Sequence, residues 1–344
     1  MGIDTNIYPI KMGKIKKGEK NSITDVAGVK IGHVTLDNGD VKTGVTAILP
    51  HGGNIFKEKV VAATYVINGF GKSVGLVQID ELGTIETPIV MTNTLSVGTC
   101  TTALVKHILK ENEDIGTSTG TVNSVVCECN DGWLNDIRGL HVKEEHVFEA
   151  LEKASDICEE GAVGAGTGMR CFGLKGGIGT SSRIVELDSK EYTLGVLVLS
   201  NFGSLEGLIV NGTNLGEKNF DIESSEDKGS IITVIATDIP LNERQLKRLC
   251  KRVPAGLART GSYYGNGSGD IVFAFTTANR VNHYKEKDIV HMKIIHEDRI
   301  DSIFKAVVEA TEEAVISSML HGKTTTGING RTAKSLCEYM GLLE

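Results

Sequence analysis

The chain has 344 residues, 40% hydrophobic and 23% charged, which is the composition of a globular protein with a large core. A net charge of −8 without a basic stripe argues against nucleic-acid binding, and no apolar run reaches the roughly 18 residues of a membrane span. The start of the chain lacks the pattern of a secretory signal, and the seven cysteines are odd in number and scattered. We expect reduced thiols, a cytoplasmic location, and neither a nucleic-acid nor a membrane partner.

Short apolar runs follow a Lys-rich leader, residues 1–21. They are β-rich and bounded by turn residues, so they predict strands at 26–34, 44–49, 60–67 and 74–79. Helical spacing of apolar residues predicts helices over 96–109 and 144–160. The glycine-dense segment 161–168 is interpreted as a close-packed loop beneath the core.

The second half of the chain also contains both predicted strands and predicted helices. Strands are predicted at 182–187, 194–200, 207–210, from Ser230, and at 271–277, and helices at 241–252 and 303–320. No change of composition within 22–344 is long enough to be an interdomain linker. The sequence therefore predicts one large α/β domain in which helices cover a strand-rich centre.

Several familiar motifs fail on their spacing. Gly71-Lys72-Ser73 is not a P-loop because Val66 stands where the first glycine is required. His141 and His146 would lie about 140° apart on a helix, too far for two ligands of one metal. Cys127 and Cys129 lack a second cysteine pair and are interpreted as core residues. We expect no metal and no cofactor.

Polar residues lie at three predicted strand ends. Carboxylates and amides follow a buried run within 125–136, Asn201 ends one strand, and 266–270 opens another. Turn chemistry explains each of them alone. Together with Ser230, at the start of a fourth strand, they could form one pocket.

Gly229 and Ser230 join a polar, acidic segment, 219–228, to a buried strand. In one interpretation the segment is an exposed loop and Ser230 is simply the first strand residue. In the other, the serine hydroxyl cleaves the Gly229–Ser230 bond, and the new α-amine, with a pKa of about 7.7 to 8.0, becomes its general base. These residues alone favour the first interpretation.

Four longer segments resemble a known family, and this resemblance favours the second interpretation of Ser230. They are Val45–Asn54, Val66–Ser73, Thr92–Gly98 and Gly164–Met169. They resemble the DmpA-type aminopeptidases, self-processing serine peptidases (peptidase family S58) that include the β-peptidyl aminopeptidases. The resemblance runs from about Ile23 to about Gly330.

The resemblance implies a four-layer αββα sandwich of the DmpA and ornithine acetyltransferase type. It implies cleavage before Ser230 into an α segment, 1–229, and a β segment, 230–344, of one domain. The two segments would stay associated, and several αβ units would form a homo-oligomer.

The resemblance also assigns roles at the site of bond cleavage. Ser230 resembles the nucleophile, and its freed amine the base. Asn201 matches the asparagine that stabilises the oxyanion, and Ser268 a serine that orients the amine. Asp270 stands where relatives carry the longer Glu, which puts its contact with Ser268 or with the amine in doubt.

Two further positions would bind the substrate. Glu128 resembles the carboxylate that receives the substrate's free ammonium group. Asn130 stands where some relatives carry Tyr as a further oxyanion donor, and its side chain is shorter.

The implied function is a serine aminopeptidase acting on peptides, aminoacyl amides or esters with a free N-terminus. One alternative is a β-peptidyl or ω-amino-amide hydrolase on the same scaffold. Another is an unprocessed relative that binds a small amine, which an intact Gly229–Ser230 bond would favour.

Overall fold

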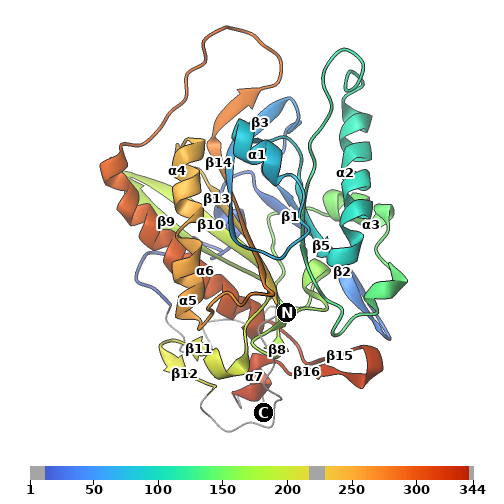
Figure 1. Ribbon diagram of the computed structural model, residues 1–344. Helices are drawn as coiled ribbons and strands as arrows, with labels where there is room; N and C mark the ends of the chain where they lie inside the picture. Colours follow the sequence, from blue (N-terminus) through green and yellow to red (C-terminus); the bar gives the residue numbers. More distant parts are fainter. Residues whose placement is uncertain (1–11, 217–228, 341–344) are drawn as a thin grey trace.

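The computed structural model describes residues 12–216 and 229–340, which form two β-sheets with helices outside them (Figure 1). Part of the predicted leader, 1–11, and the predicted loop, 219–228, lie outside the described residues. No helix within the described residues is long and apolar enough to cross a membrane.

The larger sheet has six strands in the order β4-β3-β14-β13-β10-β9. In chain order they are β3 (Glu58–Gly69), β4 (Thr84–Ile85), β9 (Gly177–Leu187), β10 (Lys190–Asn201), β13 (Ser230–Thr237) and β14 (Gly269–Asn282). All eight residues of β13 are buried, and six of them are Ile, Val or Thr, whose branched side chains favour strands. It pairs in parallel with β14 and antiparallel with β10.

The smaller sheet has the order β1-β2-β5-β6. Its strands are β1 (Lys30–Asn38), β2 (Val41–Leu49), β5 (Ile89–Asn93) and β6 (Val125–Cys129). Three short two-stranded sheets belong to neither of these. They are β7 (Arg170–Cys171) with β8 (Leu174–Lys175), β11 (Ile209–Val210) with β12 (Thr213–Asn214), and β15 (Thr325–Thr326) with β16 (Thr332–Ala333).

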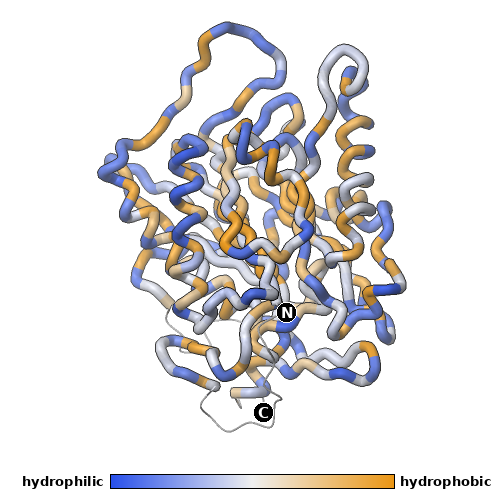
Figure 2. The backbone as a smooth tube through the Cα atoms, viewed as in Figure 1, coloured by the Kyte–Doolittle hydropathy of each residue, from blue (hydrophilic) through white to orange (hydrophobic). Residues whose placement is uncertain are grey.

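Helices contact the two sheets on different sides of the molecule (Figure 1). The helices α4 (Glu243–Cys250), α5 (Val253–Arg259), α6 (Ile300–Leu320) and α7 (Leu336–Tyr339) belong to the side of the larger sheet, and α2 (Val97–Glu111) and α3 (Glu144–Glu152) to that of the smaller one. Buried apolar residues form three clusters. The first packs α4, α5 and α6 against the larger sheet, and the second lies between the two sheets. The third packs α2 and α3 against the smaller sheet. Figure 2 shows the same trend, with hydrophobic residues concentrated along the inner strands.

The predicted strand at 74–79 is wrong. Val74 makes only an isolated bridge to Val126, and α1 (Leu76–Leu82) follows Gly75, whose φ is +98°. Ile79 is buried whereas Val77 is 87% exposed, so only one face of this segment packs. Because the apolar run is short, its spacing does not distinguish a strand from a helix.

The predicted helix over 144–160 ends early, at Glu152. Ser155 then exchanges two backbone hydrogen bonds with Ile31 of β1, at 2.8 and 2.9 Å. Ile157, which helical spacing placed in the core, is 69% exposed. Pairing with a strand remote in sequence has overridden the helical pattern of this segment.

The glycine-dense loop packs closely, as predicted. A Cβ at Gly166 would lie 2.6 Å from Gly161 O, and one at Gly168 only 2.1 Å from Lys42 O. The fully buried Lys175 holds this loop: its Nζ donates hydrogen bonds to the carbonyls of Gly166, Met169 and Gly176 at 2.9, 3.0 and 2.7 Å. One side chain thus satisfies three buried carbonyl groups.

We expect Lys175→Met to lower the free energy of unfolding by about 3 kcal/mol or more, because three buried carbonyls lose their donor. Burial lowers the pKa of Lys175 from 10.5 to about 7. Folding therefore releases a proton between these pH values, so the lysine's contribution is least below pH 7 and grows as the pH rises toward 10.5. Thermal unfolding at pH 7 and pH 9 should show a Tm difference between wild type and variant that is larger at pH 9. A smaller difference at pH 9 would contradict this sign.

Candidate active site

Ser230 begins the central strand of the larger sheet. Its pairing partners are Asn201, the last residue of β10, and Gly269, the first residue of β14. The side chain is buried, and its Oγ has no nitrogen or oxygen hydrogen-bond partner. Three strand ends therefore meet around a hydroxyl that has no nitrogen or oxygen partner within the described residues.

Gly229 precedes Ser230 in a space that admits no side chain. A Cβ there would lie 2.1 Å from Asn201 O and 2.4 Å from Phe202 Cα, both backbone atoms that cannot move away alone. Close backbone approach therefore requires the glycine. Its carbonyl oxygen accepts a hydrogen bond from Gly269 N at 3.2 Å.

The Asn201 amide is fixed at both ends. Its Oδ1 accepts a hydrogen bond from Arg170 N at 2.9 Å, and its Nδ2 donates one to Asn130 O at 3.0 Å. An amide nitrogen carries two hydrogens, so one remains to donate to a substrate. The side chain is therefore oriented before any ligand binds, as electrostatic stabilisation of an oxyanion requires.

Ser268 and Asp270 form a buried pair beside Gly269. Ser268 Oγ donates to Asp270 Oδ1 at 2.6 Å, and both residues are 1% exposed. The shorter aspartate thus keeps the contact that the sequence put in doubt.

The Glu128 carboxylate is buried in β6 of the other sheet. Its Oε1 accepts a hydrogen bond from Lys72 N at 2.8 Å, and its Oε2 accepts one from Thr94 Oγ1. No lysine, arginine or histidine within 12–216 and 229–340 forms an ion pair with it. A Cβ on Gly71 would lie 3.7 Å from Glu128 Oε1 and 3.8 Å from Gly269 Cα, so the carboxylate lies near the start of β14.

Asn130 directly follows β6 and lines a cavity at the start of β13. Its side chain is exposed, and Oδ1 accepts a hydrogen bond from Gly132 N at 2.9 Å. It is the backbone carbonyl of Asn130 that meets the Asn201 amide. The contact seen here therefore orients Asn201 through the main chain.

A thiol lies next to the candidate nucleophile. Burial raises the pKa of Cys129 well above its usual value, against a smaller opposing effect of Ser230. Since only the thiolate is a strong nucleophile, this cysteine does not compete with the hydroxyl. All seven cysteines are free thiols, as predicted.

A cavity of about 590 Å³ opens at the Gly229–Ser230 junction. It contains Asn201, Asn130 and Gly229 and also three residues that the sequence did not single out: Trp133, Arg170 and Arg331. Trp133 is the chain's sole tryptophan and lies in the polar segment 125–136, which is the signal that could have found it.

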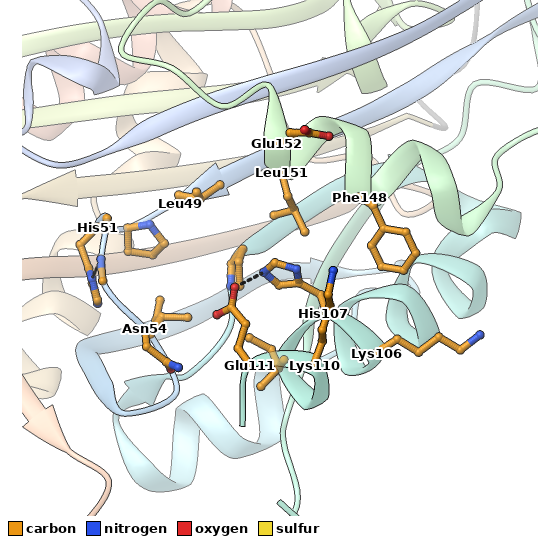
Figure 3. A pocket seen from close by; sticks show the side chains of 16 residues that line it. Leu49, His51, Asn54, Lys106, His107, Lys110, Glu111, Phe148, Leu151 and Glu152 are labelled. Atoms are coloured by element: carbon orange, nitrogen blue, oxygen red, sulfur yellow. Dashed lines mark hydrogen bonds and ion pairs between the residues drawn. The ribbon is translucent and has the colours of Figure 1, made fainter. Parts of the chain in front are cut away.

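A larger pocket, about 740 Å³, contains none of the predicted site residues (Figure 3). It lies between the loop after β2, where His51 and Asn54 lie, and the helices α2 and α3. His107 and Glu111 of α2 approach each other there at 3.9 Å. Pocket size therefore does not identify the candidate site.

The arrangement could support covalent hydrolysis, because it combines a hydroxyl without a nitrogen or oxygen partner, an oriented amide donor, a buried serine–carboxylate pair and a carboxylate without a cationic partner in the described residues. The model of the family described as peptidase family S58 matches residues 21–333. The chain belongs to peptidase family S58. Membership confirms the predicted resemblance.

Curated relatives and solved structures agree with this family. The chain is 41% identical to the β-peptidyl aminopeptidase BapA of Sphingosinicella microcystinivorans, over 93% of this chain and 86% of the relative. A crystal structure from Pyrococcus horikoshii OT3 has 53% identity and a TM-score of 0.94, covering 99% of this chain and 98% of the other.

The L-aminopeptidase D-Ala-esterase/amidase of Ochrobactrum anthropi is similar at 33% identity and a TM-score of 0.90, over 96% of this chain and 95% of that one. That structure is described as a prototype for the serine aminopeptidases and a variant of the Ntn hydrolase fold. The S58 chain is thus an α/β protein of this fold, and the family and its relatives support a serine aminopeptidase, a hydrolase of amide bonds.

Proposed function

We propose that the chain is a self-processing N-terminal-nucleophile serine aminopeptidase, which removes N-terminal residues from peptides, aminoacyl amides or esters. The observation that carries the proposal is the position of Ser230. Its Oγ, which has no nitrogen or oxygen partner in the described residues, lies at the first residue of a buried central strand, directly after a glycine that close packing requires. Asn201 and the Ser268–Asp270 pair lie at the same end of the sheet.

Maturation starts with attack of Ser230 Oγ on the Gly229 carbonyl carbon. The hydrogen bond from Gly269 N to the Gly229 oxygen supports this step, because it stabilises negative charge on that oxygen. The hydroxyl proton passes to the Ser230 nitrogen as the peptide bond becomes an ester, and water then hydrolyses the ester. The products are an α segment, 1–229, and a β segment, 230–344, held together because β13 pairs with β10 and β14 pairs with β3.

In turnover, the freed Ser230 amine accepts the hydroxyl proton as Oγ attacks the substrate's first amide carbonyl. Burial favours the neutral form of an amine, so this base is available near neutral pH. The free hydrogen of Asn201 Nδ2 stabilises the oxyanion, and the Ser268–Asp270 pair orients the amine. The leaving amine departs, and water hydrolyses the acyl-enzyme.

Glu128 supplies the preference for a free N-terminus. Its buried carboxylate has two hydrogen-bond donors but no cation, so a substrate ammonium would complete its environment. The exposed Asn130 side chain, which lines the cavity, contacts the bound substrate.

A β-peptidyl hydrolase is the second candidate function. The observation that favours it is the 41% identity to a β-peptidyl aminopeptidase. An ω-amino-amide substrate places the same ammonium and carbonyl groups farther apart and would use the same residues.

We also propose the four-layer αββα sandwich. Three apolar clusters support it: one between the first helices and the larger sheet, one between the two sheets, and one between the smaller sheet and its helices. A homo-oligomer of αβ units and a cytoplasmic location stay predictions.

The proposal is tested by the intact mass of freshly purified protein under denaturing conditions. We expect two masses, for residues 1–229 and 230–344, together with hydrolysis of alanine p-nitroanilide. A single uncut chain that hydrolyses no aminoacyl amide would overturn the proposal and favour a small-amine-binding protein.

A further inference from the structure

Among residues 12–216 and 229–340, the cavity beside the Gly229–Ser230 junction is lined by two guanidinium groups and by no carboxylate. Both lie against the same indole: Arg170 Cζ is 3.6 Å and Arg331 Cζ 5.8 Å from the centre of the Trp133 ring. Neither arginine has an acidic partner within 12–216 and 229–340. Like charges held this close without a counter-ion favour binding of an anion.

The arginines are held in place by the backbone around them. Arg331 Nη1 donates to Trp133 O at 3.3 Å, and Arg170 Nη2 donates to Gly173 O at 3.4 Å. Arg170 Nε is buried without a hydrogen-bond partner. Within the described residues the guanidinium groups make no further hydrogen bonds, so several of their Nη donors remain for a ligand in the cavity.

Glu128 and the cavity lie toward different neighbours of the strand that begins at Ser230. In the larger sheet β13 lies between β14 and β10. The Glu128 carboxylate lies near Gly269 of β14, whereas the cavity contains Asn201 of β10. A substrate whose ammonium binds Glu128 and whose carbonyl carbon lies at Ser230 Oγ therefore directs its leaving amine toward the arginines.

We propose that Arg170 and Arg331 bind the carboxylate of the leaving group, so that the preferred substrates are short amides whose leaving amine is an amino acid with a free carboxylate. This inference rests on the proposed aminopeptidase function and specifies its substrate class. A planar guanidinium matches a carboxylate with two parallel hydrogen bonds, and the Trp133 face fixes its orientation. A long peptide or a neutral amide lacks the negative charge at this position.

The test compares kcat/KM for Ala-Ala with that for Ala-Ala-amide, which differ only in this charge. We expect wild type to prefer the acid by roughly tenfold or more, the value of a hydrogen-bonded charge. Arg331→Gln and Arg170→Gln should each bring the ratio of acid to amide toward one. Arg170→Gln retains the backbone N–H that holds Asn201, and the amide substrate reports the active fraction of each preparation.

Arg138→Gln is the matched control, because Arg138 is exposed one residue beyond the cavity residue Ile137 and does not line the cavity. It removes the same charge and should keep the wild-type ratio. Equal hydrolysis of acid and amide by wild type would overturn the inference, as would an equal loss of preference in Arg138→Gln. Failure of the proposed function itself is different: wild type would then hydrolyse neither dipeptide nor alanine p-nitroanilide.

Discussion

Ser230→Ala should yield one uncut chain of 344 residues with no aminopeptidase activity. The substitution removes the atom that attacks Gly229 and, in turnover, the substrate. We expect kcat to fall on the order of 10⁶-fold, as loss of a serine nucleophile does in another hydrolase. Because Ser230 Oγ has no nitrogen or oxygen partner, the alanine removes no such hydrogen bond and should leave the fold intact.

Intact mass and hydrolysis of alanine p-nitroanilide measure the two effects of Ser230→Ala separately. Ser302→Ala is the matched control, since this serine is exposed on α6 and bonds only to Arg299 O of its own turn. It should be cleaved and active like wild type. Cleavage or turnover in Ser230→Ala would remove Ser230 from the mechanism, and melting far below wild type would show a structural role instead.

Much of the fold was predictable because the buried strands carry their pattern in the residues themselves. The strand from Ser230 is a continuous run of buried, mostly β-branched residues, which is typical of a strand covered on both faces. The helix over 303–320 likewise extends by only three residues, to Ile300–Leu320. Failures occurred where a distant segment decides, as at Ser155, which pairs with β1.

The convergence of the candidate site followed only in part from the sequence. Polar strand ends at Asn201 and 266–270 predicted a common pocket with Ser230, and the pairing of β10, β13 and β14 brings them together. The sequence could not reveal that Asn201 is held by a backbone group of Arg170, because such contacts leave no residue pattern.

The same limit explains why the arginine cavity was missed. Trp133, Arg170 and Arg331 come from three segments far apart in the chain, and no spacing rule connects them. Gly229 is a related case. This glycine is required by a close approach to Asn201 and Phe202, which depends on tertiary packing and leaves no pattern in the sequence.

Glu128→Gln should separate the two reactions of Ser230. Self-cleavage needs no ammonium group, because Gly229 is in the middle of a chain when it is attacked. Turnover of a substrate with a free N-terminus does need the ammonium group to bind. Without the Glu128 carboxylate this buried ammonium lacks its partner, which costs about 3 to 5 kcal/mol. We therefore expect normal cleavage into 1–229 and 230–344 but a loss of kcat/KM for alanine p-nitroanilide on the order of 100- to 1,000-fold.

Glutamine preserves the local hydrogen bonds of Glu128, which makes the comparison clean. Its amide oxygen still accepts from Lys72 N, and its NH₂ donates to Thr94 Oγ1, since a hydroxyl also accepts. Mass spectrometry of the purified variant, followed by kcat/KM on the same preparation, gives both results. Normal turnover would show that another group binds the ammonium, whereas an uncut variant would show that Glu128 acts in maturation, and either outcome would reject the assigned role.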